Sequence, residues 1–413
     1  MVQFPRGEIA PADGSIPESA LVDVETRTFH AYVHIPYCEV KCGYCDFNTY
    51  TADEIGTSTQ GNFAKTLISE IELAEQVLET SGFPKRECTS VFFGGGTPTM
   101  LPASNLIEML AKLKSTFRIS EDADITTEAN PDSVDEEYIA ALKAGGFNRI
   151  SFGMQSAVPH VLKVLERTHK PENVGKVVGF AKAVGLATSV DLIYGAPGES
   201  LDDWRQTLEA AIALDTDHIS AYSLIVEPGT KLARQVRLGE VPEPSDDMHA
   251  DMYELTEVLL SQAGFFNYEV SNWSKSVKER SGHNMAYWKS MDWWGFGPGA
   301  HSHVGGVRWW NVKNPAAYSD RMKAGVSPAL EREIIDHENR DIEKVMLETR
   351  ISDGISLDWL KSKGFADSAT VAGLIADQLI EAQTASKGTI VLTAKGRLLA
   401  DSVVLKLLGQ QII

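Results

Sequence analysis

Short β-branched or aromatic runs alternate with helical stretches along much of this chain, and this alternation strongly constrains its fold. The pattern begins at about residue 29 and is typical of βαβ units in an α/β protein with a parallel sheet. Six expected strands fall short of a closed eight-unit barrel, so we predict a partial (β/α)6 barrel. The expected strands are Phe29–Ile35, Thr89–Phe93, Asp124–Glu128, Arg149–Phe152, Thr188–Ile193 and His218–Leu224, and the expected helices are Asn62–Glu79, Ser104–Phe117, Asp135–Ala144, Pro171–Val184 and Leu201–Leu214.

Beyond residue 240 the pattern changes. Val241–Ser245 is expected to be a linker before a helix at Asp246–Ala263, and a strand at Asn267–Trp273 is expected to extend the sheet. The aromatic- and glycine-rich stretch His283–Trp310 has no clear period. The last part predicts a small winged-helix-like module, with helices near Ile342–Leu347, Leu357–Lys363 and Val371–Ala382, a β-hairpin at Gln383–Leu392 and a helix at Ala394–Leu408.

These changes divide the chain into four parts. We expect a flexible N-terminal segment (1–28), the partial barrel (29–240), a sheet extension (241–333) and a C-terminal domain (334–413). The C-terminal domain lacks the Lys- and Arg-rich stripe of a DNA-binding module, so we favour a docking or lid role for it.

Composition argues against several classes of function. The net charge of −19 disfavours non-specific nucleic-acid binding, which depends on Lys and Arg neutralising phosphates. Residues 1–28 have neither the basic nor the apolar region of a signal peptide. No apolar run approaches the ~18 residues that indicate a membrane span. We therefore expect a cytoplasmic protein.

Three of the four cysteines lie within eight residues, at Cys38, Cys42 and Cys45, directly after the first expected strand. A structural zinc site is usually closed by four ligands, and a cuboidal iron–sulfur cluster has four irons to ligate. Three thiolates would leave one iron open to a small molecule. The alternatives are unrelated cysteines or a partial zinc site. Cys88 stands apart and is expected to be a buried strand residue.

Polar or glycine-rich segments follow several of the expected strands. Gly94-Gly95-Gly96-Thr97 follows the second strand, Glu128 ends the third, Gln155 follows the fourth, and Asp191 lies near the end of the fifth. Ligands of such barrels gather at the carboxyl ends of the strands. The glycine-rich turn lacks the spacing of a P-loop or a Rossmann motif, so it does not indicate a nucleotide phosphate site.

The spacing Cys-x3-Cys-x2-Cys, with Tyr44 before the last cysteine, resembles the signature of the radical S-adenosylmethionine (SAM) superfamily. Further motifs resemble the anaerobic coproporphyrinogen III oxidase-like family within it, from residue 29 onward. They are His34-Ile35-Pro36-Tyr37-Cys38, Phe93-Gly94-Gly95-Gly96-Thr97-Pro98-Thr99, Glu128-Ala129-Asn130-Pro131, Phe152-Gly153-Met154-Gln155-Ser156, Asp191-Leu192-Ile193-Tyr194-Gly195 and Gly297-Pro298-Gly299-Ala300-His301-Ser302.

The resemblance implies a radical SAM partial barrel with a [4Fe–4S] cluster on Cys38, Cys42 and Cys45, whose open iron SAM chelates. It also implies a set of SAM contacts, in which Arg149 and Lys163 remain alternatives to Arg167. The contacts are Tyr32, Tyr44, Gly95, Gly96, Thr97, Glu128, Gln155, Arg167 and Asp191.

Within the family, two features separate the porphyrinogen dehydrogenases from a heme-chaperone branch. The dehydrogenases carry a fourth cysteine where this chain has Phe47, and a longer segment before the first strand, where this chain has 28 residues. The chaperones carry His-Asn-x-x-Tyr-Trp, which this chain matches at His283, Tyr287 and Trp288. The resemblance implies that these three residues bind heme, with His301 and His303 as rival iron ligands.

The function that the resemblance implies is heme binding and delivery to an acceptor protein, for which a respiratory hemoprotein is one candidate class. One alternative is an oxygen-independent coproporphyrinogen III dehydrogenase, which oxidises propionate side chains to vinyl groups. Another is a different radical SAM enzyme of heme metabolism, because the residues place no limit on the chemistry that cluster, SAM and pocket support. The separation in sequence between the cysteines and His283 further predicts separate cluster and heme sites.

Overall fold

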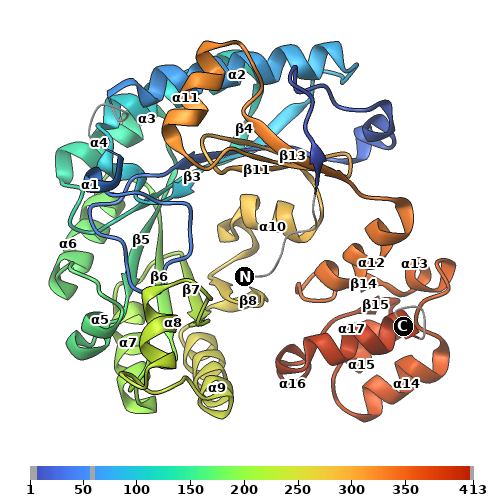
Figure 1. Ribbon diagram of the computed structural model, residues 1–413. Coiled ribbons are helices and arrows are strands. Elements are labelled where there is room, and N and C mark those ends of the chain that lie inside the picture. The colour runs from blue at the N-terminus through green and yellow to red at the C-terminus, as the bar shows by residue number, and fades with distance from the viewer. Residues whose placement is uncertain (1–6, 56–60, 410–413) are drawn as a thin grey trace.

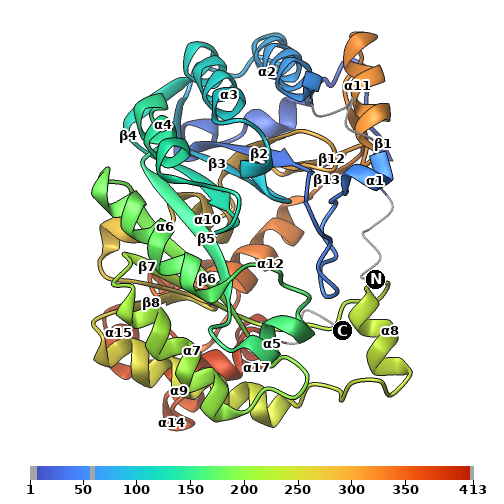
Figure 2. The ribbon, with the colours of Figure 1, turned by 90° about the vertical axis from the view of Figure 1, so that its left-hand side faces the viewer.

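The computed structural model describes residues 7–55 and 61–409, and its centre is a curved sheet of six parallel strands with helices outside it (Figures 1 and 2). The strands lie side by side in chain order. This arrangement confirms the predicted partial barrel. The strands are β2 (Phe29–Ile35), β3 (Glu87–Gly95), β4 (Arg118–Ala129), β5 (Arg149–Gln155), β6 (Ala187–Tyr194) and β7 (His218–Ser223).

Alternating residues of each strand face opposite sides of the sheet. In β2, the apolar residues Ala31, Val33 and Ile35 are buried in the main hydrophobic core, where Leu67 and Ile71 of one outer helix also lie. The residues between them face the barrel interior. The outer helices are α2 (Phe63–Thr80), α3 (Ala103–Thr116), α4 (Glu136–Gly145), α5 (Pro159–Val164), α6 (Pro171–Ala183) and α7 (Leu201–Ala213).

At the β7 edge, a short antiparallel hairpin extends the sheet. It consists of β8 (Phe266–Glu269) and β9 (Asn272–Ser274), with β9 beside β7. The single strand expected at Asn267–Trp273 is therefore wrong. The chain reverses after the buried Glu269, whose carboxylate accepts a hydrogen bond from the Asn272 side chain and stabilises the turn.

At the β2 edge, the aromatic- and glycine-rich stretch and the residues after it form strands that we did not predict. β10 (Asp292–Phe296) pairs with β2 in parallel, and β11 (His301–Val304), β12 (Val307–Asn311) and β13 (Ala329–Ile334) follow as an antiparallel meander. β1 (Glu8–Ile9) pairs with β13 and makes a sheet of 13 strands within the described residues. The N-terminal segment, expected to be flexible, thus joins the sheet from residue 8 and buries Ala20.

The remaining helices of this part surround the barrel or fill it. α10 (Gly282–Trp288) lies inside the curve of the sheet, whereas α9 (Asp246–Gln262) packs on the outer helix α7 (Figure 1). The others are α1 (Ala52–Ile55), α8 (Lys231–Arg237) and α11 (Pro315–Lys323).

The C-terminal residues form a helical domain with a separate hydrophobic core that includes Val345, Leu360 and Leu407. Its helices are α12 (His337–Glu348), α13 (Leu357–Ser362), α14 (Ser368–Ala376), α15 (Ala382–Ser386), α16 (Ala394–Leu398) and α17 (Ala400–Leu408). β14 (Ile355–Ser356) and β15 (Thr389–Ile390) form a two-stranded antiparallel sheet.

Three expectations about this domain are wrong. The hairpin expected at Gln383–Leu392 begins instead with α15, because the alanine-rich stretch favours a helix, and β15 pairs with the distant β14. The helix expected at Val371–Ala382 ends at Ala376, and the closing helix is interrupted at Leu399. The winged-helix character is not confirmed.

Among the described residues, no helix is both long and apolar enough to cross a membrane.

Candidate functional site

The inside of the curved sheet holds a cavity of about 570 Å3. Its wall at the carboxyl ends of the strands contains every residue expected to hold the cluster or SAM, which is where barrels of this kind bind their ligands. Its opposite wall contains His283 and Tyr287 of α10, whereas Trp288 does not line the cavity. The two groups expected at separate sites therefore face a common space.

The cysteine loop follows β2 and folds back over the end of that strand. The Cys38 amide donates a hydrogen bond to the Tyr50 carbonyl (3.0 Å), and the Cys45 amide donates to the Cys42 carbonyl (3.1 Å). The three cysteines of the loop are half-buried and line the cavity. Cys88 is fully buried in β3 and does not line it, as expected from the sequence.

The loop presents thiols rather than a preformed site for a single metal ion. Burial raises the pKa of Cys38 to about 11, and burial also raises the pKa of Cys45. Within residues 7–55 and 61–409, no group of three or more His, Cys, Asp or Glu side chains is arranged to hold one ion. A cuboidal cluster ligates each thiolate through a different iron, so the thiols need not converge on one point. Three half-buried thiols from one short loop, all lining the cavity, therefore fit such a cluster.

The glycine segment at the end of β3 packs directly against this loop. A Cβ atom on Gly96 would lie 2.6 Å from the Tyr37 carbonyl oxygen and 3.0 Å from the Cys38 sulfur. Gly95 has a φ of +107°, and its amide donates a hydrogen bond to Glu128 Oε2 (3.3 Å). Glycine is required here because a side chain would displace the cysteine loop.

Two half-buried carboxylates, Glu128 and Asp191, line the cavity beside the glycine segment. Burial, together with the neighbouring Asp191, raises the pKa of Glu128 to about 8. Burial likewise raises the pKa of Asp191, whose carboxylate accepts a hydrogen bond from Ser151 Oγ (2.8 Å). Burying negative charge is costly unless a cation or hydrogen-bond donors accompany it. This part of the cavity therefore favours a ligand that carries positive charge or donates hydrogen bonds.

Arg167 supplies a cation on the cysteine side of the cavity. Its Nη1 donates toward the Cys42 sulfur (3.6 Å), and its Nη2 donates to the Gly153 carbonyl (3.0 Å). Among the described residues, the buried Nε of Arg167 has no hydrogen-bond partner, so an acceptor from a ligand would satisfy it. Gln155 at the end of β5 has a left-handed φ of +60°, a strained geometry that often accompanies functional sites.

The aromatic residues of the cavity connect its two walls. The Tyr32 hydroxyl is hydrogen-bonded to His34 Nδ1 (3.0 Å), and the Tyr32 ring stacks on His283 with centroids 6.0 Å apart. Tyr44 lines the cavity from the cysteine loop, and burial raises its pKa.

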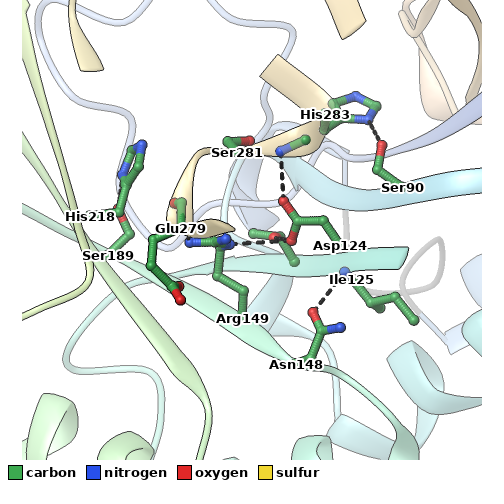
Figure 3. Close-up of polar contacts among 12 residues, drawn as sticks. Ser90, Asp124, Ile125, Asn148, Arg149, Ser189, His218, Glu279, Ser281 and His283 are labelled. Atoms are coloured by element: carbon green, nitrogen blue, oxygen red, sulfur yellow. Dashed lines mark hydrogen bonds and ion pairs between the residues drawn. The ribbon is translucent and has the colours of Figure 1, made fainter. Parts of the chain in front are cut away.

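His283 projects from α10 toward β3 and is 3% exposed (Figure 3). Its Nδ1 is hydrogen-bonded to Ser90 Oγ (2.9 Å) and its Nε2 to the Tyr287 hydroxyl (2.8 Å). The ring also stacks on Phe92 with centroids 5.3 Å apart. Both ring nitrogens are therefore engaged in this structure.

The sequence reasoning missed the residues that hold α10 in the barrel. Asp124 accepts hydrogen bonds from the Gly282 amide (2.9 Å) and from Arg149 Nε (3.2 Å), and Arg149 also donates to the Glu279 carbonyl (3.1 Å) (Figure 3). Arg149, an alternative to Arg167 in the sequence, is thus engaged by the start of α10. The signal in the sequence was that Asp124 and Arg149, both charged, begin two neighbouring expected strands.

Asn48 is a second residue that the sequence did not indicate. Its side-chain amide donates hydrogen bonds to the backbone carbonyls of Pro298 (3.0 Å) and Lys313 (2.9 Å). The backbone carbonyl of Asn48 is hydrogen-bonded to His34 Nε2 (3.0 Å). These contacts join the cysteine loop to the loop before β11 and to the loop after β12, which lie 250 and 265 residues away in the chain. No local pattern reports such a long-range contact.

Comparison with known proteins places the chain in a family. The model of the radical SAM superfamily matches residues 32–211. The heme chaperone HemW of Mycobacterium tuberculosis is 41% identical over 390 residues, covering 94% of this chain and 97% of the relative. HemW of Bacillus subtilis is 33% identical over 389 residues, with coverage of 92% and 99%.

A solved structure supports the same placement at the level of the fold. Coproporphyrinogen III oxidase (HemN) from Escherichia coli matches with a TM-score of 0.77 at 21% identity, covering 95% of this chain and 92% of that one. At this identity the match concerns the fold alone. With the two HemW relatives spanning nearly their full lengths, this chain belongs to the HemW family of the radical SAM superfamily.

Proposed function

We propose that this protein is a heme chaperone, which binds heme and transfers it to an acceptor protein. The observation that carries the proposal is the 41% identity to HemW of Mycobacterium tuberculosis over 94% of the chain, because that relative is named a heme chaperone. Aromatic rings that line the cavity support the proposal. Tyr32 and Phe92 of the sheet stack on His283 of α10, and a flat macrocycle packs well on such side chains.

We further propose that Cys38, Cys42 and Cys45 hold a [4Fe–4S] cluster and that SAM binds beside it. When bound, such a cluster supplies an open iron for SAM and electrons for its cleavage. Arg167 would pair with the SAM carboxylate, since its buried Nε lacks an acceptor among the described residues. Glu128 and Asp191 would attract the positive charges and hydroxyl groups of SAM.

For heme we propose the wall formed by α10, where His283, Tyr287 and Trp288 match the heme motif of the family. His283 and Tyr287 line the cavity, and Tyr287 packs on Trp293 of β10, the strand beside β2, with ring centroids 4.6 Å apart. From the family resemblance we also propose that the protein acts in the cytoplasm and that its acceptor is another hemoprotein.

Anaerobic reconstitution tests the cluster first. Cys38→Ser, Cys42→Ser and Cys45→Ser proteins should each lose the iron, sulfide and broad visible absorption of the cluster. Cys88→Ala is the matched control and should retain them, because Cys88 lies outside the cavity. A Cys88→Ala protein without a cluster, beside a Cys38→Ser protein that keeps one, would contradict the assignment.

Heme transfer tests the function itself. The reconstituted protein should bind hemin in a spectrophotometric titration and should then pass it to an apo-hemoprotein such as apomyoglobin. Transfer should be faster than hemin loss to buffer, which a dialysis control measures. If the protein binds no hemin, or releases it to the acceptor and to buffer at the same rate, the chaperone proposal is wrong.

One observation favours a second candidate, an oxygen-independent coproporphyrinogen III dehydrogenase. The fold matches that of HemN from Escherichia coli over nearly the whole of both chains. The likeness in fold does not carry the reaction, because the same scaffold supports different chemistries.

A further inference from the structure

Glu70 is a carboxylate in the middle of α2 that is 1% exposed and does not line the cavity. Its Oε2 accepts hydrogen bonds from the Gly297 amide (2.7 Å) and the Tyr318 hydroxyl (2.6 Å). Its Oε1 accepts one from Asn311 Nδ2 (2.7 Å). The three donors lie 227 to 248 residues away, in the loop after β10, in β12 and in α11. One carboxylate thus joins an outer helix of the barrel to three segments of the sheet extension.

The carboxylate of Glu70 is costly to bury. All three donors are uncharged, and burial raises the pKa of Glu70 to about 7 although the donors oppose that rise. A buried carboxylate costs free energy that an apolar side chain would not, so the packing of α2 alone does not explain this residue. A network of several donors on one carboxylate instead fixes the segments that carry them.

The segment that Glu70 holds most directly is the turn at residues 297–299. Asn311 Nδ2 also donates to the Gly297 carbonyl (2.9 Å), so both polar backbone groups of Gly297 are engaged. Gly297 has a φ of +102°, and a Cβ atom on it would lie 2.4 Å from the carbonyl oxygen of His34, near the end of β2. The turn therefore lies between Glu70 and the strand from which the cysteine loop starts.

Two contacts continue from these partners into the cysteine loop. The Pro298 carbonyl accepts the hydrogen bond from Asn48 Nδ2 (3.0 Å). Tyr37 directly precedes Cys38, and it lies close enough to Tyr318 to contribute, after burial and Glu70, to the raised pKa of Tyr318. Figure 1 shows α11, which carries Tyr318, beside α2.

We propose that Glu70 is a positioning residue for the cysteine loop, which it holds through the 297–299 turn and through Tyr318. The role rests on the proposed function only in that this loop is taken as the cluster site. The carboxylate fixes the turn, and the turn contacts His34 and Asn48. These two residues are hydrogen-bonded to each other and hold the loop against the end of β2.

Alkylation of the full chain with iodoacetamide, in protein prepared without iron, tests this role. Mass spectrometry follows each cysteine separately. The three loop cysteines are half-buried and report on the loop, whereas the fully buried Cys88 reports on unfolding of the barrel. In Glu70→Gln one oxygen becomes an amide group that cannot accept, so a buried donor loses its partner. The loop cysteines should then react at least about fivefold faster than in the wild-type protein, with an unchanged rate at Cys88.

Glu199→Gln is the matched control. Glu199 is 7% exposed, and burial raises its pKa to about 7 as well. Its carboxylate accepts hydrogen bonds from the amides of Gly195 (2.8 Å) and Ala196 (3.0 Å), in the loop after β6. This variant should show wild-type rates at all four cysteines. Unchanged rates in Glu70→Gln, or equal increases in both variants, would overturn the proposal.

A second variant covers the case in which Glu70→Gln also exposes Cys88 and has therefore unfolded. Tyr318→Phe then decides, because it removes one donor from Glu70 and keeps the ring. The loop cysteines should react at least about twofold faster, and no increase overturns the proposal. Iron uptake by the wild-type protein is measured separately after anaerobic reconstitution. A wild-type protein that takes up no iron contradicts the proposed cluster, whereas the alkylation rates still decide the role of Glu70.

Discussion

At the scale of single residues, the cavity contains acidic side chains that accept hydrogen bonds but are not paired with a positive charge among the contacts described here. Glu128 is an example, since burial and Asp191 raise its pKa to about 8 and the Gly95 amide donates a hydrogen bond to its carboxylate. Tyr32 and Tyr287 also face it without supplying positive charge. A cationic ligand should therefore bind most tightly when Glu128 is ionised.

The affinity of the protein for SAM should therefore depend on pH. The ligand-free protein holds Glu128 protonated below about pH 8, so binding SAM at lower pH must also expel a proton. Affinity should fall as pH drops from 8.5 to 6.5, by at most about tenfold per unit. Anaerobic calorimetry can measure this slope. Glu128→Gln should bind more weakly but with a flatter profile, and an equally steep Glu128→Gln profile would show that another group titrates.

At the scale of elements, long-range contacts hold the cysteine loop in place. Asn48 joins it to the carbonyls of Pro298 and Lys313, and Gly299 lies directly beneath the Asn48 side chain. A Cβ atom on Gly299 would lie 2.4 Å from Asn48 Nδ2. The cysteine loop is therefore positioned by the sheet extension as well as by β2.

Two glycine substitutions test this contact. Gly299 and Gly198 both have left-handed φ values, +76° and +81°, but a Cβ on Gly198 would meet nothing within 4 Å. Gly198→Ala should cost about 1–2 kcal/mol of unfolding free energy from backbone strain alone. Gly299→Ala should cost more and should lower the iron content after reconstitution. Equal costs in denaturant unfolding, with equal iron contents, would show that the contact is dispensable.

The sequence predicted the barrel elements well because their apolar periodicity is local. It did not predict β10–β12, because glycines and clustered tryptophans interrupt the alternation of Asp292–Asn311. It also gave the cysteine, glycine and carboxylate positions, since each follows a strand end. Residues such as Asn48 and Asp124 could not be found this way, because their roles depend on partners more than 150 residues distant.

At the scale of the whole molecule, the C-terminal domain contacts the rest of the protein at several places. Asp353 pairs with Arg280 and Lys289, which flank α10 on either side, at 2.7 Å each. Arg397 Nη2 pairs with Glu257 of α9 (2.7 Å). The C-terminal domain therefore contacts the two ends of α10, the helix of the His-Asn-x-x-Tyr-Trp motif.

Asp353→Asn should loosen α10 without unfolding the protein. Both ion pairs are partly exposed, so the loss of global stability should stay within about 1 kcal/mol. Hydrogen exchange of residues 282–288 should nevertheless become faster. Glu257→Gln removes the contact with α9 and is the matched control, expected to leave that exchange unchanged. If both variants exchange alike, Asp353 has no specific effect on α10.

The reaction type is the property on which the two candidate functions differ most. Phe47 occupies the position of the dehydrogenases' fourth cysteine, is 59% exposed and lines the cavity. An apolar side chain there cannot replace a thiol in redox chemistry. With SAM and a low-potential reductant, the reconstituted protein should therefore form no protoporphyrinogen IX from coproporphyrinogen III. HemN from Escherichia coli under the same conditions is the positive control, and liquid chromatography with mass spectrometry follows both tetrapyrroles. Vinyl product formed together with stoichiometric 5′-deoxyadenosine would instead identify the protein as a dehydrogenase, because a chaperone has no need to oxidise a propionate.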